Sequence, residues 1–498
     1  MKYPLPLGRI FFQILVALCM ALGVTSLPAC SASKSAAVAP VPAEKSAPYP
    51  AYASVRNLAD TATADDSASS LSFNVPIPTL TDDEGEHHLK GDTAFSRKFN
   101  VEGGLGPAFN ANACIACHTL DGRGALPAIP VGETKVRLGT GESILLRISY
   151  ETERGSEIVP GFTEQLFHRG VYELRPDSPG TGQADIDMTY ATANFTYPDG
   201  SVAELRTPKF ILSNAYDAVG GKKSALEHPD LRISPRIGPP MIGLGLLEAI
   251  EEKDILALAD PDDKDGDGIS GRANMIDGKV GRFGWKANNV SVRTQVAAAF
   301  SNDMGIRSSI FPKESIWNTP LLDALIARLA DLWKPLDVEL PDATLDALEF
   351  YTSTVAVPPR RDIGNTVVMN GARQFETIGC TSCHTPHFKT AESHISPALS
   401  HLDIYPFSDG LLHDMGDELA DGRRDHGADG REWKTRPLWG IGLTKTVNSK
   451  AGFLHDGRAR SLEEAVLFHG GEANGSRQRF ASLPLKERLE VIAFLRSL

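Results

Sequence analysis

The stretches ACIACHTLDGRG (113–124) and GCTSCHTPHF (379–388) decide how this sequence folds, because each contains Cys-x-x-Cys-His. The chain has six cysteines, and the four in these motifs are Cys114, Cys117, Cys380 and Cys383. Two cysteines at this spacing can form thioethers with the vinyl groups of one haem, and the adjacent histidine then ligates its iron. The sequence therefore predicts two covalently bound c-type haems, with His118 and His384 as proximal ligands.

Two other kinds of site use the same cysteine spacing. A structural zinc site needs four ligands from a Cys/His set, and a thioredoxin-like redox pair needs no following histidine. A single motif leaves both interpretations open. Two copies, each followed by histidine, in a chain whose other cysteines are only Cys19 and Cys30, favour haem attachment.

The first 30 residues, MKYPLPLGRIFFQILVALCMALGVTSLPAC, combine two early cations, an apolar stretch and a Leu-Pro-Ala-Cys ending. This pattern predicts a signal peptide over residues 1–29, and its ending resembles a bacterial lipobox, which makes Cys30 the expected lipid anchor. Ordinary cleavage near Ala29 or Ala32 is the alternative. Residues 30–80, rich in Ala, Ser and Pro over their first part, predict a flexible tether. We therefore expect a periplasmic lipoprotein, because no later segment approaches the ~20 apolar residues of a membrane span.

The net charge of the 498-residue chain is −13, and loss of Lys2 and Arg9 with the signal leaves 48 basic and 63 acidic residues, a net charge of −15. An acidic protein is a poor partner for nucleic acid or for an anionic membrane face. The charge suits a small basic electron-donor protein, such as a cytochrome c, although many acidic proteins have no basic partner.

The segments around the two motifs predict a mainly α fold with two cytochrome c-like haem domains. The stretch ARQFETIG before the second motif places Phe375 and Ile378 on one helical face. We expect an N-terminal haem domain over residues 81–345 and a C-terminal cytochrome c domain over residues 362–498. The runs ILLRI, ADIDMTY and VAELR have the composition of short strands, so they predict a β-containing insertion at about residues 135–210.

The two halves of the chain also share a weaker repeat. SPRIGPPMIGLGLLEAI (234–250) resembles REWKTRPLWGIGLTKTV (431–447). Downstream, GRFGWKANNVSVRTQVAAAF (281–300) aligns without gaps to AGFLHDGRARSLEEAVLFHG (451–470). In this alignment Trp285 is matched with His455.

An asymmetry in this repeat concerns the iron ligands. Ser461 and Glu464 form a capping-box pattern that begins a helix leading to His469, and the aligned residue in the first copy is Ala299. If each half wraps its haem alike, His469 can fill the sixth site of the second iron, whereas an alanine cannot ligate. We therefore expect an open first haem and a closed second haem. The alternative is that His469 is an ordinary core or surface histidine.

Several motifs together resemble those of the bacterial di-haem oxidoreductases, sometimes labelled thiol oxidoreductases, over roughly residues 80–498. These proteins are relatives of the di-haem cytochrome c peroxidases and of the methylamine-utilisation di-haem enzyme. The motifs are GPAFNANACIACHTLDGRG, DGDGISGR, GRFGWKA, GCTSCHTP, REWKTRPLWGIG and FLHDGRARSLEEAVLFHGGEA.

The resemblance implies an oxidoreductase that reduces peroxide at an open N-terminal haem. Electrons would come from a small donor protein and pass through the C-terminal haem. Oxidation of a protein or organic substrate through a ferryl haem, as in the methylamine-utilisation relative, is a second interpretation. A pure electron-transfer cytochrome with both haems closed is a third.

Residue by residue, the family's bridging tryptophan falls on Trp285, its active-site glutamine on Gln295 and its catalytic acid on Asp303, where Asp replaces Glu. A packing role for the tryptophan and a surface position for the aspartate are the alternatives. His469 occupies the position of the family's methionine ligand, which predicts a lower potential for the second haem. No histidine closely follows His118, so the distal histidine that blocks some resting peroxidases is not expected.

The stretch DPDDKDGDGISGR contains the first half of a calcium-loop pattern. Asp263, Asp265 and Asp267 alternate, and Gly268 permits the sharp turn. The twelfth position is Asn274 instead of a bidentate glutamate, so the loop is not a complete EF-hand. The sequence predicts Ca²⁺ binding here, with a solvated acidic turn as the alternative.

Five further histidines are not expected to ligate the iron of the second haem. We expect His455 to hold a haem propionate or its own loop instead of an iron, because His469 already fits the ligand position. His413, His387, His168 and His228 remain undecided, with structural roles favoured for the first two.

Overall fold

The computed structural model describes residues 48–65, 68–139, 143–171, 182–215, 225–329 and 338–498. Helices account for 32% of the residues and strands for 19%, so helices predominate, as predicted, but several small sheets accompany them. Within the described residues, none of the helices combines the length and apolar character that a membrane span requires. The predicted signal peptide and Cys30 lie outside the described residues.

The α-helices are α1 Asp82–Ser96, α2 Cys114–Cys117, α3 Leu244–Glu248, α4 Glu252–Leu256, α5 Val292–Ala299, α6 Pro320–Leu329, α7 Asp342–Thr354, α8 Thr366–Thr377, α9 Thr444–Val447, α10 Leu462–Leu467, α11 Asn474–Ser482 and α12 Leu485–Ser497. Many are short because Gly, Pro and Asn interrupt the chain. The longest, α1, begins with a capping box in which Thr81 accepts the backbone N–H of Glu84.

The strands are β1 Ala108–Phe109, β2 Val136–Arg137, β3 Ile144–Thr152, β4 Gly155–Glu157, β5 Gln165–Leu166, β6 Arg169–Gly170, β7 Asp185–Thr196, β8 Val202–Ser213, β9 Leu231–Ile237, β10 Met275–Ile276, β11 Lys279–Val280, β12 Phe388–Lys389, β13 Asp403–Ile404, β14 Leu412–Asp414 and β15 Glu432–Lys434. All the named pairs are antiparallel.

One helix pair packs beside each motif histidine, and the two pairs are built alike. In the first, α1 packs on α7, and a Cβ added at Gly91 would lie 2.2 Å from the carbonyl oxygen of Ala347. In the second, α8 packs on α12, and a Cβ at Gly371 would lie 1.9 Å from the carbonyl oxygen of Glu490. Only glycine permits backbones to approach so closely.

Four residues after each glycine, a phenylalanine faces the motif histidine. The ring centroids of Phe95 and His118 are 6.2 Å apart, and so are those of Phe375 and His384. Both phenylalanines are buried. The two motifs therefore lie against equivalent helical walls, although the rest of each half differs.

The β region begins as predicted near residue 136 but extends past residue 210. Strand β9 pairs along β3 from Ile144 opposite Ile237 to Tyr150 opposite Leu231. Pro235 lies in β9, which is compatible with an edge strand because proline cannot donate a ladder hydrogen bond. The sequence analysis did not predict β9, because proline is uncommon within strands.

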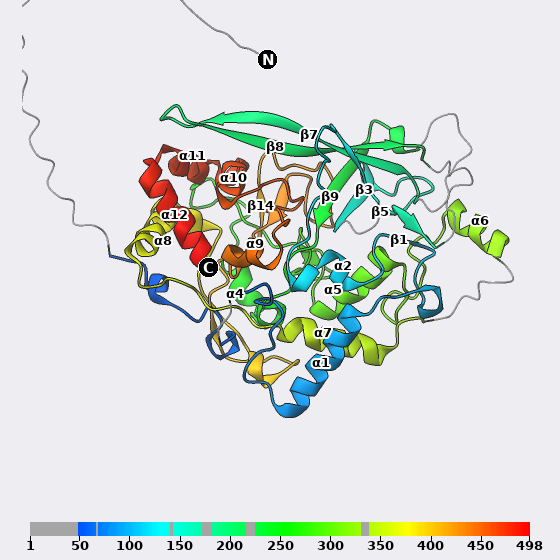
Figure 1. Ribbon diagram of the computed structural model, residues 1–498, viewed down its shortest axis with the longest axis horizontal. Helices are drawn as coiled ribbons and strands as arrows, with labels where there is room; N and C mark the ends of the chain where they lie inside the picture. Colours follow the sequence, from blue (N-terminus) through cyan, green and yellow to red (C-terminus); the bar gives the residue numbers. More distant parts are fainter. Residues whose placement is uncertain (1–47, 66–67, 140–142, 172–181, 216–224, 330–337) are drawn as a thin grey trace, which may run out of the picture. The chain divides into compact units, whose positions relative to one another are not determined.

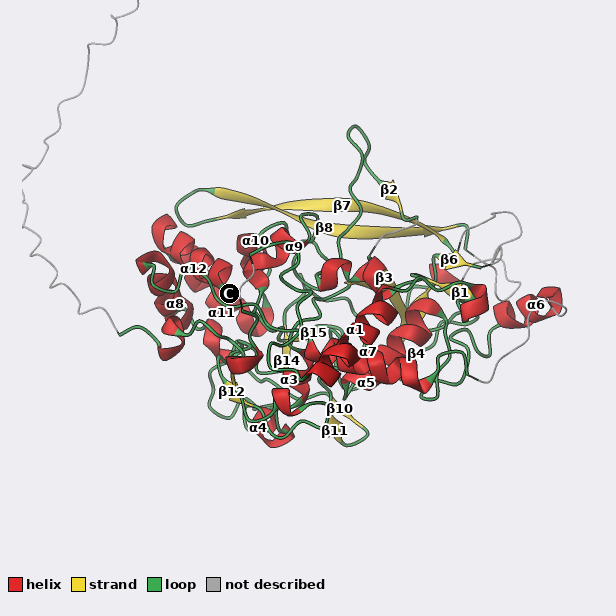
Figure 2. Cartoon of the chain, turned by 60° about the horizontal axis from the view of Figure 1, so that its bottom comes forward, coloured by secondary structure: helices red, strands yellow, loops and turns green. Residues whose placement is uncertain are grey.

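Strands β7 and β8 form a long hairpin that runs along one side of the helices (Figures 1 and 2). Its tip contacts the C-terminal half: the Tyr197 hydroxyl lies 2.7 Å from Glu463 Oε1, and Arg488 donates to Asp199 at 2.9 Å. The hairpin therefore connects the β region to α10 and α12.

Residues 48–80 differ from the flexible tether that we expected. Tyr52, Leu58, Phe73 and Ile77 are buried in the main hydrophobic core, and the backbone N–H of Ile77 donates to Thr354. These apolar side chains are spaced among Ala, Ser and Asp, so the average composition of the segment resembles that of a linker. The apolar side chains themselves are nevertheless buried. The part of the predicted tether before residue 48 lies outside the described residues.

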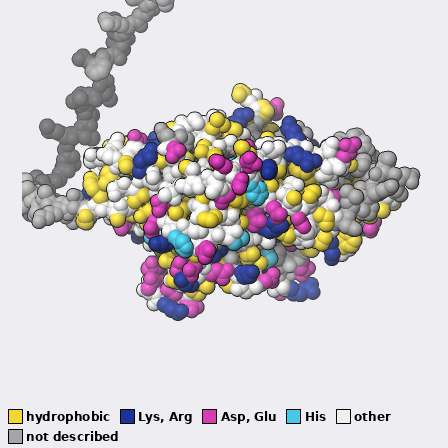
Figure 3. Space-filling view, turned by 90° about the horizontal axis from the view of Figure 1, so that it is seen from below, with side chains coloured by type: hydrophobic (Ala, Val, Ile, Leu, Met, Phe, Trp, Pro, Cys, Tyr) yellow, Lys and Arg dark blue, Asp and Glu magenta, His cyan; other side chains and the backbone are white. Residues whose placement is uncertain are grey.

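Residues 48–498 form one compact unit, and the main hydrophobic cluster runs from Tyr52 to Leu498, with two smaller clusters beside it. The predicted domain boundaries at residues 81–345 and 362–498 stay predictions. On the face shown in Figure 3, acidic and basic side chains are interspersed.

Candidate functional site

The two motif histidines are held in the same way. His118 Nδ1 lies 2.7 Å from the carbonyl oxygen of Pro239, and His384 Nδ1 lies 2.8 Å from that of Phe407. A carbonyl only accepts, so each Nδ1 carries the proton and each Nε2 keeps a lone pair. Burial lowers the pKa of both imidazoles to about 4, which keeps them neutral at pH 7. Neutral rings oriented through Nδ1 are ready to ligate a metal.

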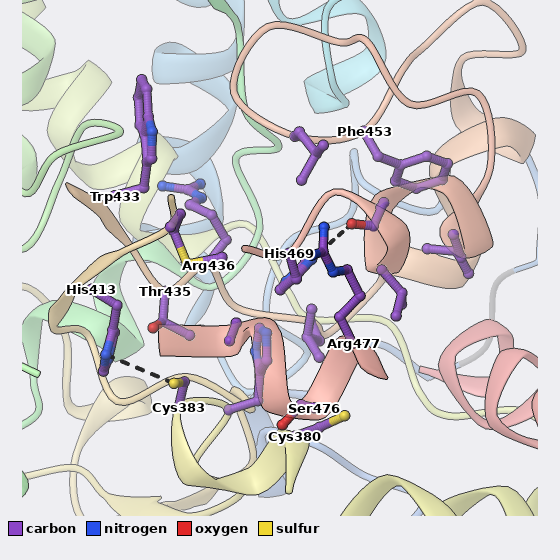
Figure 4. Close-up of a pocket in the computed structure, with 18 of the residues that line it drawn as sticks. Cys380, Cys383, His413, Trp433, Thr435, Arg436, Phe453, His469, Ser476 and Arg477 are labelled. Atoms are coloured by element: carbon purple, nitrogen blue, oxygen red, sulfur yellow. Dashed lines mark hydrogen bonds between the residues drawn. The ribbon is translucent and has the colours of Figure 1, made fainter. Parts of the chain in front are cut away.

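The second motif opens on an apolar cavity of about 190 Å³. Cys380, Cys383 and His384 form one wall, and His469 lines the cavity as well. Figure 4 shows His469 across the cavity from the two cysteines, which form no disulfide. The remaining wall is mostly hydrophobic, as a site for a haem ring requires.

His469 is oriented in the same way as the motif histidines. Its Nδ1 lies 2.7 Å from the carbonyl oxygen of Ala465, so Nε2 is left with its lone pair. Burial lowers the pKa of this imidazole as well. His384 and His469 therefore present two neutral ring nitrogens to one cavity, and this fits an iron with a histidine on each side.

The first motif opens on a larger cavity of about 700 Å³. Cys114, Cys117 and His118 line it, and helix α5 supplies the facing wall through Gln295 and Ala299. Besides His118, the histidine that lines this cavity among the described residues is His426, and it is exposed.

The segments before α5 and α10 confirm the sequence repeat. Isolated bridges join Phe283 to Asn289 and the aligned Phe453 to Ala459. The following serines are both N-caps, and each accepts the backbone N–H three residues later. Ala299 and His469 thus occupy matching positions, but α10 ends at Leu467, so His469 follows the helix instead of lying within it as expected.

Asp303 lies in a π-helical turn, Phe300–Met304, that continues α5. Its side chain lines the first cavity, and its carboxylate lies near enough to Cys114 and Cys117 to add to the burial that raises the pKa of both thiols. Its carbonyl oxygen accepts the backbone N–H groups of Asn110 and Ala111 at 2.7 and 3.1 Å. The π-turn is therefore anchored from outside the helix, and such turns are frequent at functional sites.

Asp303 is half-buried, and burial raises the pKa of its carboxyl to about 6. Gln165 Nε2 donates to Asp303 Oδ1 at 2.9 Å, which opposes that rise by stabilising the carboxylate. A carboxyl group with a pKa near 6 can both accept and donate a proton near neutral pH.

Gln295, the second residue implied by the family resemblance, also lines the first cavity. Its Oε1 accepts from Asn289 Nδ2 at 3.0 Å. This hydrogen bond orients the amide, so the Gln295 Nε2 hydrogens are available on the other side.

Trp285 is the third such residue, and it lines both cavities together with Arg436. The indole is buried, and its N–H donates to the carbonyl oxygen of Ile237 at 2.9 Å. The guanidinium of Arg436 lies 5.0 Å from the ring centroid and that of Arg123 lies 5.4 Å away. An aromatic ring therefore separates the two predicted haem sites.

Arg123 and Arg436 indicate whether these cavities can bind haem, because a haem carries anionic propionates. Burial lowers the pKa of Arg123 to about 9 and that of Arg436 to about 10, yet neither forms an ion pair with any residue that the structure describes. Buried cations without a carboxylate partner are costly unless an anion completes the site. Together with the thiols and the oriented imidazoles, they fit a haem in each cavity.

The histidines left undecided have separate positions. His455 stacks on Trp433 with ring centroids 3.8 Å apart and lines the second cavity. His228 stacks on Tyr150 at the surface, with centroids 4.6 Å apart. His168 is buried and lines neither haem cavity, and its two ring nitrogens have no hydrogen-bond partner among the described residues.

His413 lies between two carboxylates beside the second motif. Its Nε2 is 2.9 Å from Asp409 and its Nδ1 is 2.7 Å from Glu472. Although burial opposes protonation, these carboxylates and Cys383 raise the pKa of His413 to about 12, so the ring is an imidazolium. His387 is exposed and lies 2.8 Å from Asp403.

The predicted calcium-loop residues do converge. Oxygen atoms of Asp263, Asp265 and Asp267 lie within 4.8 Å of one another. Asn274, at the twelfth position, is instead buried and donates to the carbonyl oxygens of Lys286 and Asp425. The loop can therefore offer only its first three carboxylates in the EF-hand pattern.

Sequence reasoning missed Gln165, Arg123 and Arg436. Arg436 had a signal, since it is a cation in the otherwise apolar stretch RPLWGIG and aligns with Pro239 in the repeat. Gln165 had none, because it lies 138 positions from Asp303.

No curated protein shows significant similarity to the chain. A profile of the family described as "di-haem oxidoreductase, putative peroxidase" matches residues 52–498, which include both motifs, Asp303 and His469. The two haems of that family correspond in number to the two cavities, and the resemblance seen in the sequence is confirmed. The chain therefore belongs to the di-haem oxidoreductase family.

Proposed function

We propose that the protein is an exported di-haem c-type peroxidase. It reduces a peroxide in the cavity at His118 and receives electrons through the site at His384. The observation that carries this proposal is the asymmetry of the two facing walls. His469 offers a ring nitrogen to the second cavity, whereas Ala299 and the carboxyl of Asp303 face the first.

His118 and His384 would each hold a haem, which would supply iron for peroxide binding at the first site and for electron exchange at both. Peroxide reduction consumes two electrons and two protons, and it breaks the O–O bond. The protein must therefore hold a proton close to the bound substrate and must separate that substrate from the electron donor.

Asp303 is the group that moves the proton. In its ionised form the carboxylate accepts the proton of the substrate O–H group. The resulting carboxylic acid then donates to the departing oxygen, which leaves as water or as an alcohol, because hydroxide and alkoxide are poor leaving groups. The pKa of about 6 allows both steps, and Gln165 keeps one carboxylate oxygen in place.

Gln295 positions the substrate. Its amide oxygen already accepts from Asn289, so its Nε2 hydrogens can donate to an oxygen in the cavity. Donors that are oriented in advance stabilise developing negative charge without reorganisation.

Trp285 connects the two sites. It lines both cavities, and the cations of Arg436 and Arg123 flank its ring. We assign it as the aromatic bridge for electrons that pass from the second site to the first. The donor is a small electron-transfer protein, for which the net charge of −13 favours a basic partner.

Two measurements on the purified holoprotein test this function. The ferrous protein should bind one carbon monoxide per two haems, and it should reduce peroxide with a one-electron donor. Binding of two carbon monoxides, or of none, would contradict the assignment of one open and one closed site. A protein with one open haem but no peroxide turnover would favour oxidation of another substrate.

A further inference from the structure

The cavity at His118 is far larger than its counterpart, although both motifs hold the same kind of histidine and thiols. Its volume is about 700 Å³, against about 190 Å³ at His384. If each site accommodates one haem, the first retains several hundred cubic ångströms more than the second. A hydrogen peroxide molecule, which is about the size of two waters, does not require that space.

Two segments of the N-terminal half contribute to the wall of this larger cavity. One is the turn after β4 together with β5, which contributes Ile158, Thr163 and Gln165. The other is the loop 310–317, which follows the π-turn carrying Asp303. Each segment includes an exposed apolar residue, Ile158 in the first and Trp317 in the second.

These two segments contribute polar residues such as Lys313 and Glu314 to the lining, and they also contribute several apolar residues. We call these apolar residues the apolar entrance, and they are Ile158, Ile310, Phe311, Pro312 and Trp317. The side chains of Ile158 and Trp317 are 62% and 50% exposed, and Pro312 is exposed as well. Large apolar side chains that remain exposed around a concave site usually mark where a ligand binds.

Polar and apolar residues both line the rest of the cavity. Leu145, Val296, Phe300 and Met304 line the same cavity as Asp303. The arrangement suits a molecule with a hydrocarbon body and one polar reacting end.

We infer that the substrate is an organic hydroperoxide with a bulky apolar body, which the apolar entrance holds while its hydroperoxide group reaches Asp303. This inference rests on the proposed function and specifies its substrate class. The reaction is ROOH + 2 e⁻ + 2 H⁺ → ROH + H₂O. The O–O bond breaks, the donor protein supplies the electrons, Asp303 relays a proton, and the product alcohol leaves through the entrance.

Cumene hydroperoxide, whose body is a single substituted phenyl ring, tests the inference against hydrogen peroxide. We expect kcat/KM to be higher for cumene hydroperoxide in the native holoprotein. Trp317→Ala should lower that value about tenfold by removing apolar contact area, while kcat/KM for hydrogen peroxide is unchanged. Trp317→Phe should retain most of the preference, because it preserves an aromatic wall.

Leu485→Ala is the matched control, since Leu485 is 57% exposed but lies on α12 and lines neither haem cavity. It should leave both substrates unaffected. A loss of activity toward both peroxides in Trp317→Ala, or a change only in the KM for the donor protein, would overturn the inference and assign Trp317 to folding or to donor docking.

Calorimetric binding of cumyl alcohol, the product, provides a readout that does not depend on turnover. We expect about tenfold weaker binding in Trp317→Ala and unchanged binding in Leu485→Ala. If hydrogen peroxide is reduced but cumyl alcohol does not bind, the substrate class is wrong and the peroxidase function stands. If cumyl alcohol binds in a Trp317-dependent manner but no peroxide is reduced, the binding site stands and the peroxidase function fails.

Discussion

Three histidines in this chain are oriented by the same hydrogen bond. A backbone carbonyl accepts from Nδ1 and leaves Nε2 to face a cavity. In His118, His384 and His469 the acceptor is Pro239, Phe407 and Ala465, respectively. This hydrogen bond requires no carboxylate, so these rings remain neutral and oriented without added negative charge. This matters at a haem, because a nearby carboxylate would change the basicity of the ligand.

Replacement of His469 is the direct test of the closed site. His469→Ala should convert one low-spin haem to high spin and raise carbon monoxide binding from one to two per molecule, because the sixth ligand that we assign to the second haem is then removed. His228→Ala is the control, since His228 stacks on Tyr150 at the surface. An unchanged low-spin spectrum in His469→Ala would refute the ligand assignment.

The pKa of Asp303 predicts how peroxide turnover depends on pH. Burial raises this pKa to about 6, so the carboxylate that accepts the first proton is lost as the pH falls below about 6. Turnover should therefore decline on the acid side, and Asp303→Asn should reduce it by roughly 10²–10⁴-fold and abolish this limb. Gln165→Leu should move the limb to higher pH, because the lost hydrogen bond no longer stabilises the carboxylate. Wild-type turnover in Asp303→Asn would place the acid elsewhere.

At the scale of elements, the helix pairs α1–α7 and α8–α12 position the two motif histidines through close backbone contact. The contacts at Gly91 and Gly371 place Phe95 and Phe375 against His118 and His384. The repeated glycine and phenylalanine spacing was present in the sequence but is too common to be diagnostic by itself. The tertiary structure shows the role of this spacing, because it places both phenylalanines beside the motif histidines.

Gly371→Ala tests the role of this close approach. The new Cβ would lie 1.9 Å from the carbonyl oxygen of Glu490, so α8 and α12 must separate, and we expect a loss of about 1–3 kcal/mol in the free energy of unfolding. Gly85→Ala in α1 is the matched control. A Cβ there meets nothing within 4 Å, and alanine should stabilise the helix by about 0.5–1 kcal/mol. Denaturant titration measures both, and equal effects would exclude the packing argument.

At the scale of the whole molecule, contacts that are distant in sequence join the two halves. Ser270, just after the acidic loop, donates to Glu472 at 2.6 Å, and Glu472 also holds His413 beside the second motif. The hairpin β7–β8 makes a second connection through its tip at Tyr197 and Asp199. The stability of the second site should therefore depend on segments that belong to the first half.

Calcium binding by Asp263, Asp265 and Asp267 would strengthen the connection at Ser270. Added Ca²⁺ should raise the melting temperature, with a stabilisation of about 2.7 kcal/mol at a free concentration one hundred times the dissociation constant. A chelator should reverse the effect, and Asp265→Asn should weaken it by removing one ligand charge. An identical melting temperature with and without Ca²⁺ would mean that the loop is a solvated acidic turn.

The sequence by itself determined the features whose residues are adjacent in the chain. Each Cys-x-x-Cys-His motif names its own thiols and histidine, and the gapless alignment of 281–300 with 451–470 matched Ala299 with His469. The family followed from such motifs, because they survive as short contiguous strings. The convergence of the three loop aspartates was predictable for the same reason.

Tertiary structure decided the rest, because those features depend on contacts between residues far apart in the chain. Gln165 reaches Asp303 across 138 positions, and the cavities that share Trp285 and Arg436 exist only once both halves have packed together. Residues 48–80 have the average composition of a linker, and they become part of the core only because α7 and neighbouring segments provide an apolar surface for them. Burial, which sets the pKa of Asp303, is likewise a property of the assembled fold, since no local pattern specifies how much protein will surround one carboxyl group.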